Sequence, residues 1–208
     1  MSGDSIKVMR ARTTREKTVQ YRSLRSTDLH VEHCELDDIK TFIETHHYSR
    51  SVFGVTASEC FKVTYQDDLA GGAIFGLPAG VGVAAKYADG GRLLELRRFV
   101  LCDEAPRNSE SRALSVMFRE LRRAGYTRIL SYADPMHGHT GIIYKATGFE
   151  YRGRTAARKH IMWKGKKYPD RNVHQVNFPY HLELRAALAS GEATRVRIEP
   201  KHIYVKKL

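Results

Sequence analysis

The sequence predicts a mixed α/β (α+β) fold in which helices flank a central sheet. Segments with alternating apolar residues, typical of strands, are interspersed with segments whose apolar residues recur at helical spacing. Two apolar runs, Glu59 to Tyr65 and Leu69 to Leu77, are joined by a turn-prone Gln-Asp-Asp connection and predict an antiparallel hairpin. With 208 residues, 42% of them hydrophobic, the chain can bury the core that such a domain needs.

The first half of the chain has clear boundaries between these elements. We expect a strand, a helix with acids in its first turn, the two hairpin strands and a further strand, over Leu29 to Cys34, Glu35 to His46, Glu59 to Tyr65, Leu69 to Leu77 and Leu93 to Leu101. The Gly71-Gly72 pair predicts a bulge. Residues 78–91 are rich in Gly and Ala and predict a loop, and because they lack a GK[ST] ending they do not indicate a P-loop.

The second half begins with a helix that Asn108 caps and Gly125 ends. It continues with a strand, a helix and two strands over Thr127 to Ala133, His139 to Thr147, Phe149 to Arg154 and Lys159 to Trp163. After Lys164 the composition changes, and we expect only a short helix and two short strands, over His181 to Ala189, Thr194 to Ile198 and Ile203 to Val205.

The net charge of +12 and the pI near 9.7 favour a polyanionic partner such as nucleic acid. The charge is concentrated at the ends, with +5 in residues 1–27, −3 in residues 28–150 and +10 in residues 151–208. A surface adapted for solubility is the alternative. We therefore expect a flexible basic arm over residues 1–27, a main domain over residues 28–165 and a basic C-terminal extension over residues 166–208.

Two classes of protein do not fit the sequence. No apolar run approaches the roughly 18 residues of a membrane span, and the N-terminal segment has no apolar stretch typical of a secretion signal. The three cysteines, Cys34, Cys60 and Cys102, are widely spaced and form no CxxC pair, which argues against a disulfide framework or a cysteine zinc site. We expect a protein of the reducing cytoplasm that makes no membrane contact.

The segment Ser131 to His139 places polar residues between a strand and a helix. In an open α/β sheet, ligands bind at the carboxyl ends of strands. Asp134 is therefore a candidate to orient or deprotonate a substrate amine, with His137 and His139 as further polar or proton-transfer groups. The alternative is that Asp134, which precedes a proline, is only a turn residue.

A second polar cluster, His46 to Arg50, ends the first helix. Histidines there interact favourably with the helix dipole, which is a sufficient structural explanation. The alternative is a site for Fe²⁺ or Zn²⁺, for which the candidate ligands are His47, Asp134, His137 and His139.

Arg97 and Arg98 are adjacent in one predicted strand, so their side chains are expected on opposite faces. Arg97 either holds a substrate carboxylate, phosphate or carbonyl oxygen or pairs structurally with Glu95 on the same face. Tyr144, on the predicted helix after Asp134, is by its position either a core aromatic or a catalyst.

The run Tyr144 to Glu150, with Gly153 behind it, resembles the helix-to-strand signature of the GCN5-related N-acetyltransferase (GNAT) fold, and the element order from Leu29 to Trp163 is similar. This resemblance implies a mostly antiparallel sheet and a Tyr144 that protonates the leaving thiolate. The family's glycine-rich cradle for the pyrophosphate of acyl-CoA is missing, because residues 103–111 contain no glycine and several acids.

The combination of LRRFVL, APRNSESR, SYADPMHGHTGIIYKATGF and HHYS between basic ends is similar to the Mom family of phage DNA-modification proteins. That resemblance implies conversion of adenine in phage DNA to N6-carbamoylmethyladenine, which protects the DNA from host restriction enzymes. It implies catalytic roles for Asp134, Tyr144, Arg97, Tyr48, His47 and His139. It implies donor binding by Ser109, Tyr65, Arg107, Asn108 and Ser111, and we assign DNA contacts to Arg50, Arg154, Arg158, Lys159, Lys166 and Lys167.

The donor stays open between an acyl-CoA and an activated glycine such as glycyl-tRNA, because carbamoylmethyl and glycyl groups are isomers. The expected partners are double-stranded DNA, with tRNA and a homodimer as further candidates, in the cytoplasm of the phage's host. A flipped adenine would need a stacking surface, for which Tyr48 and Tyr65 are candidates. The rival functions are an acyltransferase acting on a protein or small-molecule amine, and a non-enzymatic DNA-binding module.

Overall fold

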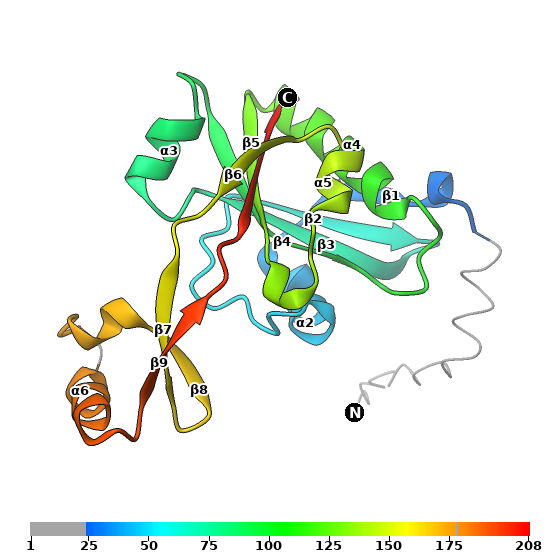
Figure 1. Ribbon diagram of the computed structural model, residues 1–208. Coiled ribbons are helices and arrows are strands. Elements are labelled where there is room, and N and C mark those ends of the chain that lie inside the picture. The colour runs from blue at the N-terminus through cyan, green and yellow to red at the C-terminus, as the bar shows by residue number, and fades with distance from the viewer. Residues whose placement is uncertain (1–23, 178) are drawn as a thin grey trace, which may run out of the picture. The chain divides into compact units, whose positions relative to one another are not determined.

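The computed structural model describes residues 24–177 and 179–208 (Figure 1). The chain divides into two compact units: unit 1 comprises residues 1–130 with 207–208, and unit 2 comprises residues 131–206. Of the arm expected over residues 1–27, residues 1–23 lie outside the described residues. Its end forms a short 3-10 helix, η1 (Ser26–Asp28).

Unit 1 is built on a mixed sheet with the strand order β1-β2-β3-β4-β5. Its strands are β1 (His30–His33), β2 (Glu59–Tyr65), β3 (Asp68–Gly76), β4 (Leu93–Leu101) and β5 (Arg128–Ala133), the last of which continues into unit 2. Neighbouring strands from β1 to β4 are antiparallel, whereas β5 runs parallel to β4. The β3–β4 register covers six residue pairs and the β4–β5 register three.

The β2–β3 hairpin forms as the sequence predicts, with a tighter turn. Gln66 and Asp67 both have positive φ, 49° and 69°, and Tyr65 is paired with Asp68, which makes a two-residue turn of the type that matches strand twist. The predicted bulge is present one residue earlier, because Val63 pairs with Gly71 and Thr64 with Leu69. Ala70 is therefore the extra residue.

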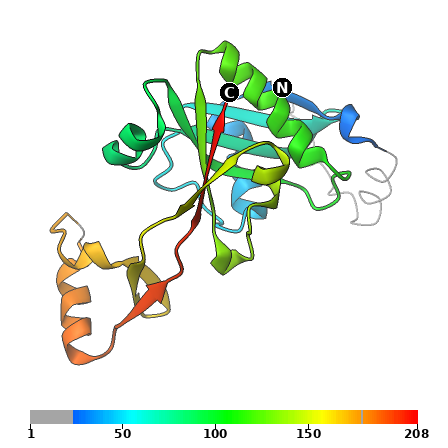
Figure 2. The same cartoon turned by 45° about the horizontal axis from the view of Figure 1, so that its top comes forward.

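Among residues 24–130, three α-helices accompany this sheet: α2 (Leu36–His46), α3 (Val81–Tyr87) and α4 (Ser109–Arg123). Helix α2 packs its buried Ile39 and Ile43 against Cys60 and Ile74. Helix α4 covers the opposite face (Figure 2). The prediction of a loop over residues 78–91 is wrong, because α3 forms within this range. The alanines and the lysine between Gly80 and Gly90 have high helix propensity and support a short helix despite the flanking glycines.

Unit 2 contains the strands β6 (Glu150–Arg154), β7 (Arg158–Trp163), β8 (Lys166–Pro169), β9 (Thr194–Ile198) and β10 (His202–Lys207). Its helices are η2 (Pro135–His137), α5 (Ile142–Ala146), η3 (Asp170–Val173) and α6 (His181–Ser190). Strands β6 and β10 pair antiparallel, and β8, β7 and β9 form a separate antiparallel sheet. Ile161 and Trp163 of that sheet pack with Leu184 of α6 in a small core.

Two expectations for unit 2 need correction. The helix predicted over His139 to Thr147 begins only at Ile142, because Gly141 has a φ of +80° and breaks the helical path. The basic run after Lys164 forms β8, which was not expected. The expected boundary between residues 165 and 166 thus falls in the turn of the β7–β8 hairpin. None of the described helices is long and apolar enough to cross a membrane.

Candidate functional site

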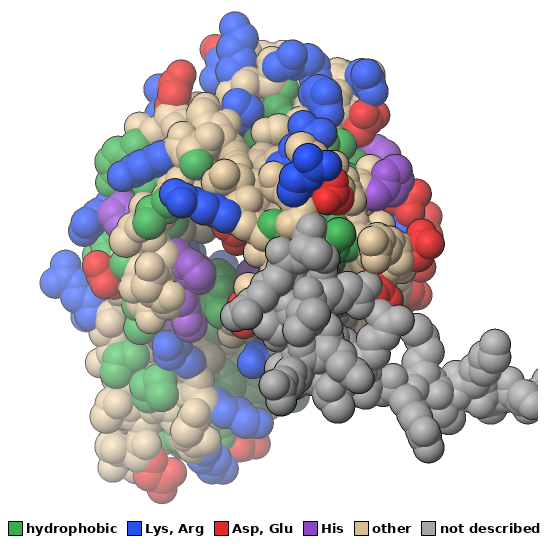
Figure 3. Space-filling view, turned by 90° about the vertical axis from the view of Figure 1, so that its right-hand side faces the viewer, with side chains coloured by type: hydrophobic (Ala, Val, Ile, Leu, Met, Phe, Trp, Pro, Cys, Tyr) green, Lys and Arg blue, Asp and Glu red, His purple; other side chains and the backbone are tan. Residues whose placement is uncertain are grey.

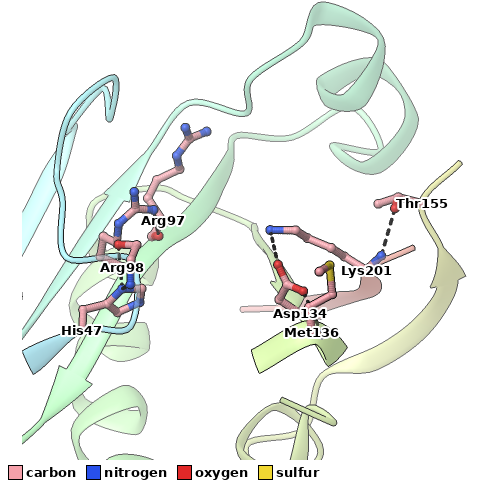
Figure 4. A network of polar contacts seen from close by, with 8 residues as sticks. His47, Arg97, Arg98, Asp134, Met136, Thr155 and Lys201 are labelled. Carbon is pink, nitrogen blue, oxygen red and sulfur yellow. Dashed lines mark hydrogen bonds and ion pairs between the residues drawn. The ribbon is translucent and has the colours of Figure 1, made fainter. Parts of the chain in front are cut away.

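Asp134 lies at the end of β5, where the sequence places it, and forms an ion pair with a residue that the sequence did not single out. Its Oδ2 is 2.8 Å from the Nζ of Lys201, and its Oδ1 accepts a hydrogen bond of 3.1 Å from the backbone N–H of Met136 (Figure 4). Asp134 is only 7% exposed. The alternative interpretation as a turn residue also holds in part, because Asp134 caps η2 through that backbone bond.

Lys201 is held in turn by a reciprocal pair of hydrogen bonds with Thr155. The backbone N–H of Lys201 donates to Thr155 Oγ1 at 3.0 Å, and the backbone N–H of Thr155 donates to the Lys201 carbonyl at 2.9 Å. The lysine side chain itself remains 42% exposed. A solvent-accessible ammonium group is therefore fixed at its base and directed at a buried carboxylate.

The electrostatic surroundings keep Asp134 ionised. Burial by itself would raise its pKa, but the hydrogen bond and positive charge of Lys201, together with the Met136 N–H, outweigh burial and lower the pKa below its ordinary value. A carboxylate with a lowered pKa is a weak base and a good hydrogen-bond acceptor. The lowered pKa therefore favours a role for Asp134 in orienting a substrate amine over a role in removing its proton, the two roles that the sequence left open.

Tyr144 lies in a cluster of aromatic rings within unit 2. Its ring centroid is 5.2 Å from those of Phe149 and Tyr204. The Tyr204 hydroxyl donates to the Thr140 carbonyl at 2.9 Å, and burial raises the pKa of Tyr204. Tyr144 keeps partial exposure, so it is neither a fully buried core aromatic nor a free surface residue.

His137 and His139 are exposed, and their backbone N–H groups donate to the Asp134 carbonyl at 3.1 and 3.2 Å. The chain thus wraps around Asp134 through its backbone. The expected metal site is not supported, because no group of three or more His, Cys, Asp or Glu side chains within residues 24–177 and 179–208 could hold an ion. At Asp134 the Lys201 ammonium takes the position that a cation would need.

In unit 1, two predicted donor-binding residues contact each other. Tyr65 and Ser109 are both 1% exposed, and their hydroxyl oxygens are 2.6 Å apart. Burial raises the pKa of Tyr65. A buried ring has no open face for stacking, so the geometry favours a structural role for Tyr65.

Arg97 is the extra residue of a second bulge, because Ile74 pairs with Arg98 and Phe75 with Leu96. The strict alternation that places Arg97 and Arg98 on opposite faces is therefore interrupted at this point of β4. Arg97 Nη1 lies 3.2 Å from Glu95 Oε2, as the structural alternative requires. Arg98 turns to the neighbouring loop, where its Nε donates to the Ser51 carbonyl at 3.0 Å (Figure 4).

The residues after α2 form a compact hydrogen-bonded loop. The His47 ring is buried, with Nδ1 2.9 Å from Ser49 Oγ, and it packs beside the exposed Tyr48 ring at a centroid distance of 4.2 Å. Arg50, which is exposed and has a φ of 50°, donates from its guanidinium to the Thr45 carbonyl.

Before α4, Arg107 and Asn108 are exposed, as donor-binding residues would be. Asn108 occupies the predicted cap position in a left-handed conformation, φ 69°, but its side chain makes no capping hydrogen bond. Its carbonyl instead accepts from Ser111 Oγ at 3.0 Å.

The expected DNA-contacting residues of unit 2 are all exposed on strands or at their ends, namely Arg154, Arg158, Lys159, Lys166 and Lys167. Lys159 of β7 stands directly opposite Arg197 of β9. Like charges directly opposite each other do not stabilise a sheet, so this pair does not contribute to the strength of the β7–β9 pairing. On the face seen in Figure 3, Lys and Arg side chains are spread widely rather than gathered in one spot.

Comparison with solved structures supports the predicted fold class. The apo form of a mutant agmatine N-acetyltransferase matches with a TM-score of 0.51 and 11% identity over 87% of this chain and all of that one. A GNAT family acetyltransferase from Elizabethkingia anophelis with acetyl-CoA bound matches with a TM-score of 0.49 and 9% identity over 87% of this chain and 99% of that chain. The match to the agmatine N-acetyltransferase confirms the mixed α/β, GNAT-like fold.

Sequence comparison identifies a family. The methylcarbamoylase Mom of Escherichia phage Mu is 32% identical over 133 residues, which are 62% of this chain and 55% of the relative, so the match spans little more than half of that protein. The model of the Mom protein family matches residues 28–208, which include every site residue described above. The chain therefore belongs to the Mom protein family.

Proposed function

We propose that this protein is a transferase that modifies the N6 amino group of adenine in phage DNA to N6-carbamoylmethyladenine and so protects the DNA from host restriction. The observation that carries the proposal is the Asp134–Lys201 pair at the end of β5, in a chain of the Mom family whose relative in phage Mu is named a methylcarbamoylase. A buried, ionised carboxylate is the group that an exocyclic amine needs as a hydrogen-bond acceptor.

The N6 amino group is a poor nucleophile, because its lone pair is delocalised into the purine ring. In the proposed mechanism Asp134 accepts a hydrogen bond from N6–H and orients the amine toward the donor carbon. N6 forms the new bond to the activated carbon of the donor as the bond between that carbon and the leaving group breaks, and the proton of N6 passes to solvent water, because Asp134 stays ionised. Tyr144 supplies the proton that the leaving group takes up, and Lys201 keeps Asp134 ionised throughout.

The donor is proposed as either an acyl-CoA or an activated glycine. Transfer of a glycyl group to N6 first gives the N6-glycyl isomer, and an isomerisation in which N6 and the glycyl amino group exchange places between the carbonyl and methylene carbons then gives N6-carbamoylmethyladenine. The GNAT-like fold, which this chain shares with an N-acetyltransferase, supports an acyl donor such as a CoA thioester. The absence of glycine from residues 103–111 supports the alternative, because a glycine-rich cradle allows backbone N–H groups to approach a pyrophosphate closely.

The exposed cations of β7, β8 and β9 would contact the phosphates of double-stranded DNA. Each such contact releases counterions, so binding should weaken steeply as salt is raised. Reaching N6 in a duplex also requires the adenine to leave the base stack.

The deciding experiment is mass spectrometry of nucleosides from the DNA of cells that express the protein. The wild type should yield deoxyadenosine heavier by one carbamoylmethyl unit, and Asp134→Asn should abolish this product. Asp170→Asn is the matched control, because Asp170 is also paired at 2.8 Å, with Arg195, but on the surface. Equal products from wild type and Asp134→Asn would remove Asp134 from the reaction. Unmodified DNA beside abundant folded wild-type protein would refute the proposed function.

A further inference from the structure

The small sheet of unit 2, formed by β8, β7 and β9, has two unlike faces. Directly paired residues, such as Met162 of β7 and Lys167 of β8, point to the same side of a sheet, as do residues two apart on one strand. Ile161 and Trp163 therefore share one face, which packs against α6. The other face, called the His160 face below, carries Arg158, His160, Met162, Lys167, Val196 and Ile198.

The register separates the cations that the sequence assigned to DNA into two pairs. Arg158 and Lys167 lie on the His160 face. Lys159 and Lys166 lie on the α6 face, the first because it is two residues before a core residue of β7 and the second because it pairs with Trp163. All four side chains are exposed, and none forms an ion pair within the described part of the chain. The two pairs therefore differ mainly in the side of the sheet from which they project.

His160 is surrounded by positive charge. Burial is the largest cause that lowers the pKa of His160, and the positive charges of Lys167, Arg158 and Lys201 lower it further. Asp170 acts in the opposite direction. Because three cations act on one ring, an anion bound beside it would relieve the repulsion among them.

The His160 ring has an unused capacity for hydrogen bonds. Its Nδ1 is buried and has no partner among the described residues, while the side chain as a whole keeps partial exposure. A buried N–H without an acceptor is costly, so the neutral ring is favoured with its hydrogen on Nε2. The lowered pKa agrees with a neutral ring. The Nε2–H group is then a donor for which the described residues provide no acceptor.

Acidic side chains are absent from the strands of this sheet. Strands β7, β8 and β9 contain no Asp or Glu. Asp170 follows the end of β8 and is already paired with Arg195 at 2.8 Å. Glu192 and Glu199 lie in the segments before and after β9. A ligand on the His160 face would thus meet cations and an N–H donor but no carboxylate from the strands, which makes the face complementary to an anion.

We propose that the His160 face holds the sugar-phosphate backbone of duplex DNA, with Arg158 and Lys167 neutralising phosphates and His160 Nε2–H donating to a phosphate oxygen. The inference rests on the proposed function and narrows its DNA contact to one side of the sheet. Contacts to phosphates fix the position of a protein on the duplex without reading its sequence. Lys201, whose charge acts on His160, is also the partner of Asp134, so the phosphate contacts and the carboxylate belong to one part of unit 2. DNA is the substrate with either donor, whereas tRNA is needed for only one of them.

The first test compares the two faces through the salt dependence of binding to a fluorescent duplex. Arg158→Gln and Lys167→Gln should each weaken binding and reduce the slope of log affinity against log salt by about 0.9, because each removes one phosphate contact. Lys159→Gln and Lys166→Gln should have less than half that effect. Arg185→Gln, at an exposed residue of α6, is the control for loss of a cation and should leave binding unchanged.

Three results of this comparison would overturn the inference. Equal effects on both faces would mean that DNA meets a general basic surface. No effect of Arg158→Gln or Lys167→Gln would remove the His160 face from binding. Weakened binding of tRNA beside unchanged binding of the duplex would assign the face to RNA.

The second test concerns His160 itself. In His160→Gln the amide nitrogen can take the place of Nε2, whereas in His160→Asn the shorter amide takes the place of Nδ1. His160→Asn should weaken duplex binding by about tenfold, and His160→Gln should retain most of the affinity. The salt slope should stay unchanged in both, because a neutral donor releases no counterions. Unchanged binding by His160→Asn, or equal losses in the two variants, would remove Nε2 from the contact.

These binding measurements use unmodified DNA, so their failure can be distinguished from failure of the proposed function. Mass spectrometry of DNA from the expressing cells supplies the second readout. Unmodified DNA together with the expected difference between the faces would refute the proposed function alone. Modified DNA together with equal effects on both faces would refute this inference alone. The comparison of surface cations decides the inference even where a His160 variant does not fold.

Discussion

Each of the two units contains a hydrogen-bonded pair of side chains that includes at least one predicted site residue. The two pairs differ in their charge and in their exposure to solvent. In unit 1, Tyr65 and Ser109 are neutral and both are closed to solvent. In unit 2, Asp134 is charged and buried, while its partner Lys201 has a side chain that is 42% exposed. The neutral pair needs no ligand to be satisfied. The charged pair can exchange one partner for a substrate, which makes it the better candidate for chemistry.

The largest effect is expected at Gly141 of unit 2, where an added side chain would meet the ring of Tyr204. A Cβ on Gly141 would lie 2.4 Å from the ring of Tyr204, and Gly141 also has a φ of +80°. Gly141→Ala should lower the free energy of unfolding by about 3 kcal/mol, since a left-handed alanine and a steric clash add together. Gly153→Ala is the matched control, with a φ of +93° and open space around the Cβ, and should cost about 1 kcal/mol. Denaturant unfolding measures both, and equal losses would argue against the clash.

Removal of Lys201 should have the next largest effect and should reverse a pH dependence. In the wild type the lowered pKa of Asp134 stabilises the folded state at every pH above the ordinary pKa of an aspartate. This stabilisation is lost as the pH falls through the pKa that Asp134 has in the folded state. In Lys201→Met the lysine no longer counteracts the effect of burial, which raises the pKa of Asp134. We expect a loss of about 1–2 kcal/mol at neutral pH, smaller than for a fully buried pair because the lysine is partly solvated.

The sign of the pH dependence tests the cause. In Lys201→Met the pKa of Asp134 should rise, so acidification from neutral pH should recover stability rather than reduce it. The double variant Asp134→Asn, Lys201→Met should lack this dependence. A Lys201→Met protein with the wild-type profile of unfolding free energy against pH would show that Lys201 does not control the ionisation of Asp134.

The neutral pair of unit 1 should respond more mildly. Tyr65→Phe removes one hydroxyl and leaves Ser109 with an unfulfilled hydrogen bond, so we expect a loss of about 1 kcal/mol in unfolding free energy. Ser109→Ala should cost a similar amount. The double variant should cost less than the sum of the two, and strict additivity in urea unfolding would indicate that the two hydroxyls do not interact.

The smallest effect is expected at the surface of unit 2. Arg195 Nε donates to Asp170 Oδ1 at 2.8 Å, the same distance as in the Asp134–Lys201 pair, but both residues are solvated. Arg195→Ala should change the unfolding free energy by no more than about 0.5 kcal/mol, and added salt should reduce even that. A loss comparable to that of Lys201→Met would show that distance, and not burial, sets the strength of these pairs.

Local patterns in the sequence determined most of the elements. The predicted bounds of β2 and β4 agree with the structure residue by residue, because alternation over several residues indicates a strand without reference to the rest of the chain. Helix α2 begins where its acidic first turn indicated. The short elements α3 and β8 were missed, since four to seven residues carry too little periodicity. The likeness of the strand-end and helix-end motifs to the Mom family was also visible in the sequence.

Only the tertiary structure decided which of the candidate residues have partners, and what kind. Asp134 was visible in the sequence as a polar residue at a strand end, but Lys201 was one cation among many in a basic tail. The two are joined only because strands from distant parts of the chain bring Thr155 and Lys201 together. His160 likewise was one residue of a predicted strand, and only the pairing of β7 with β8 brought Lys167 onto its face of the sheet. Sequence periodicity reports on neighbours along the chain, whereas ionisation and exposure depend on neighbours in space.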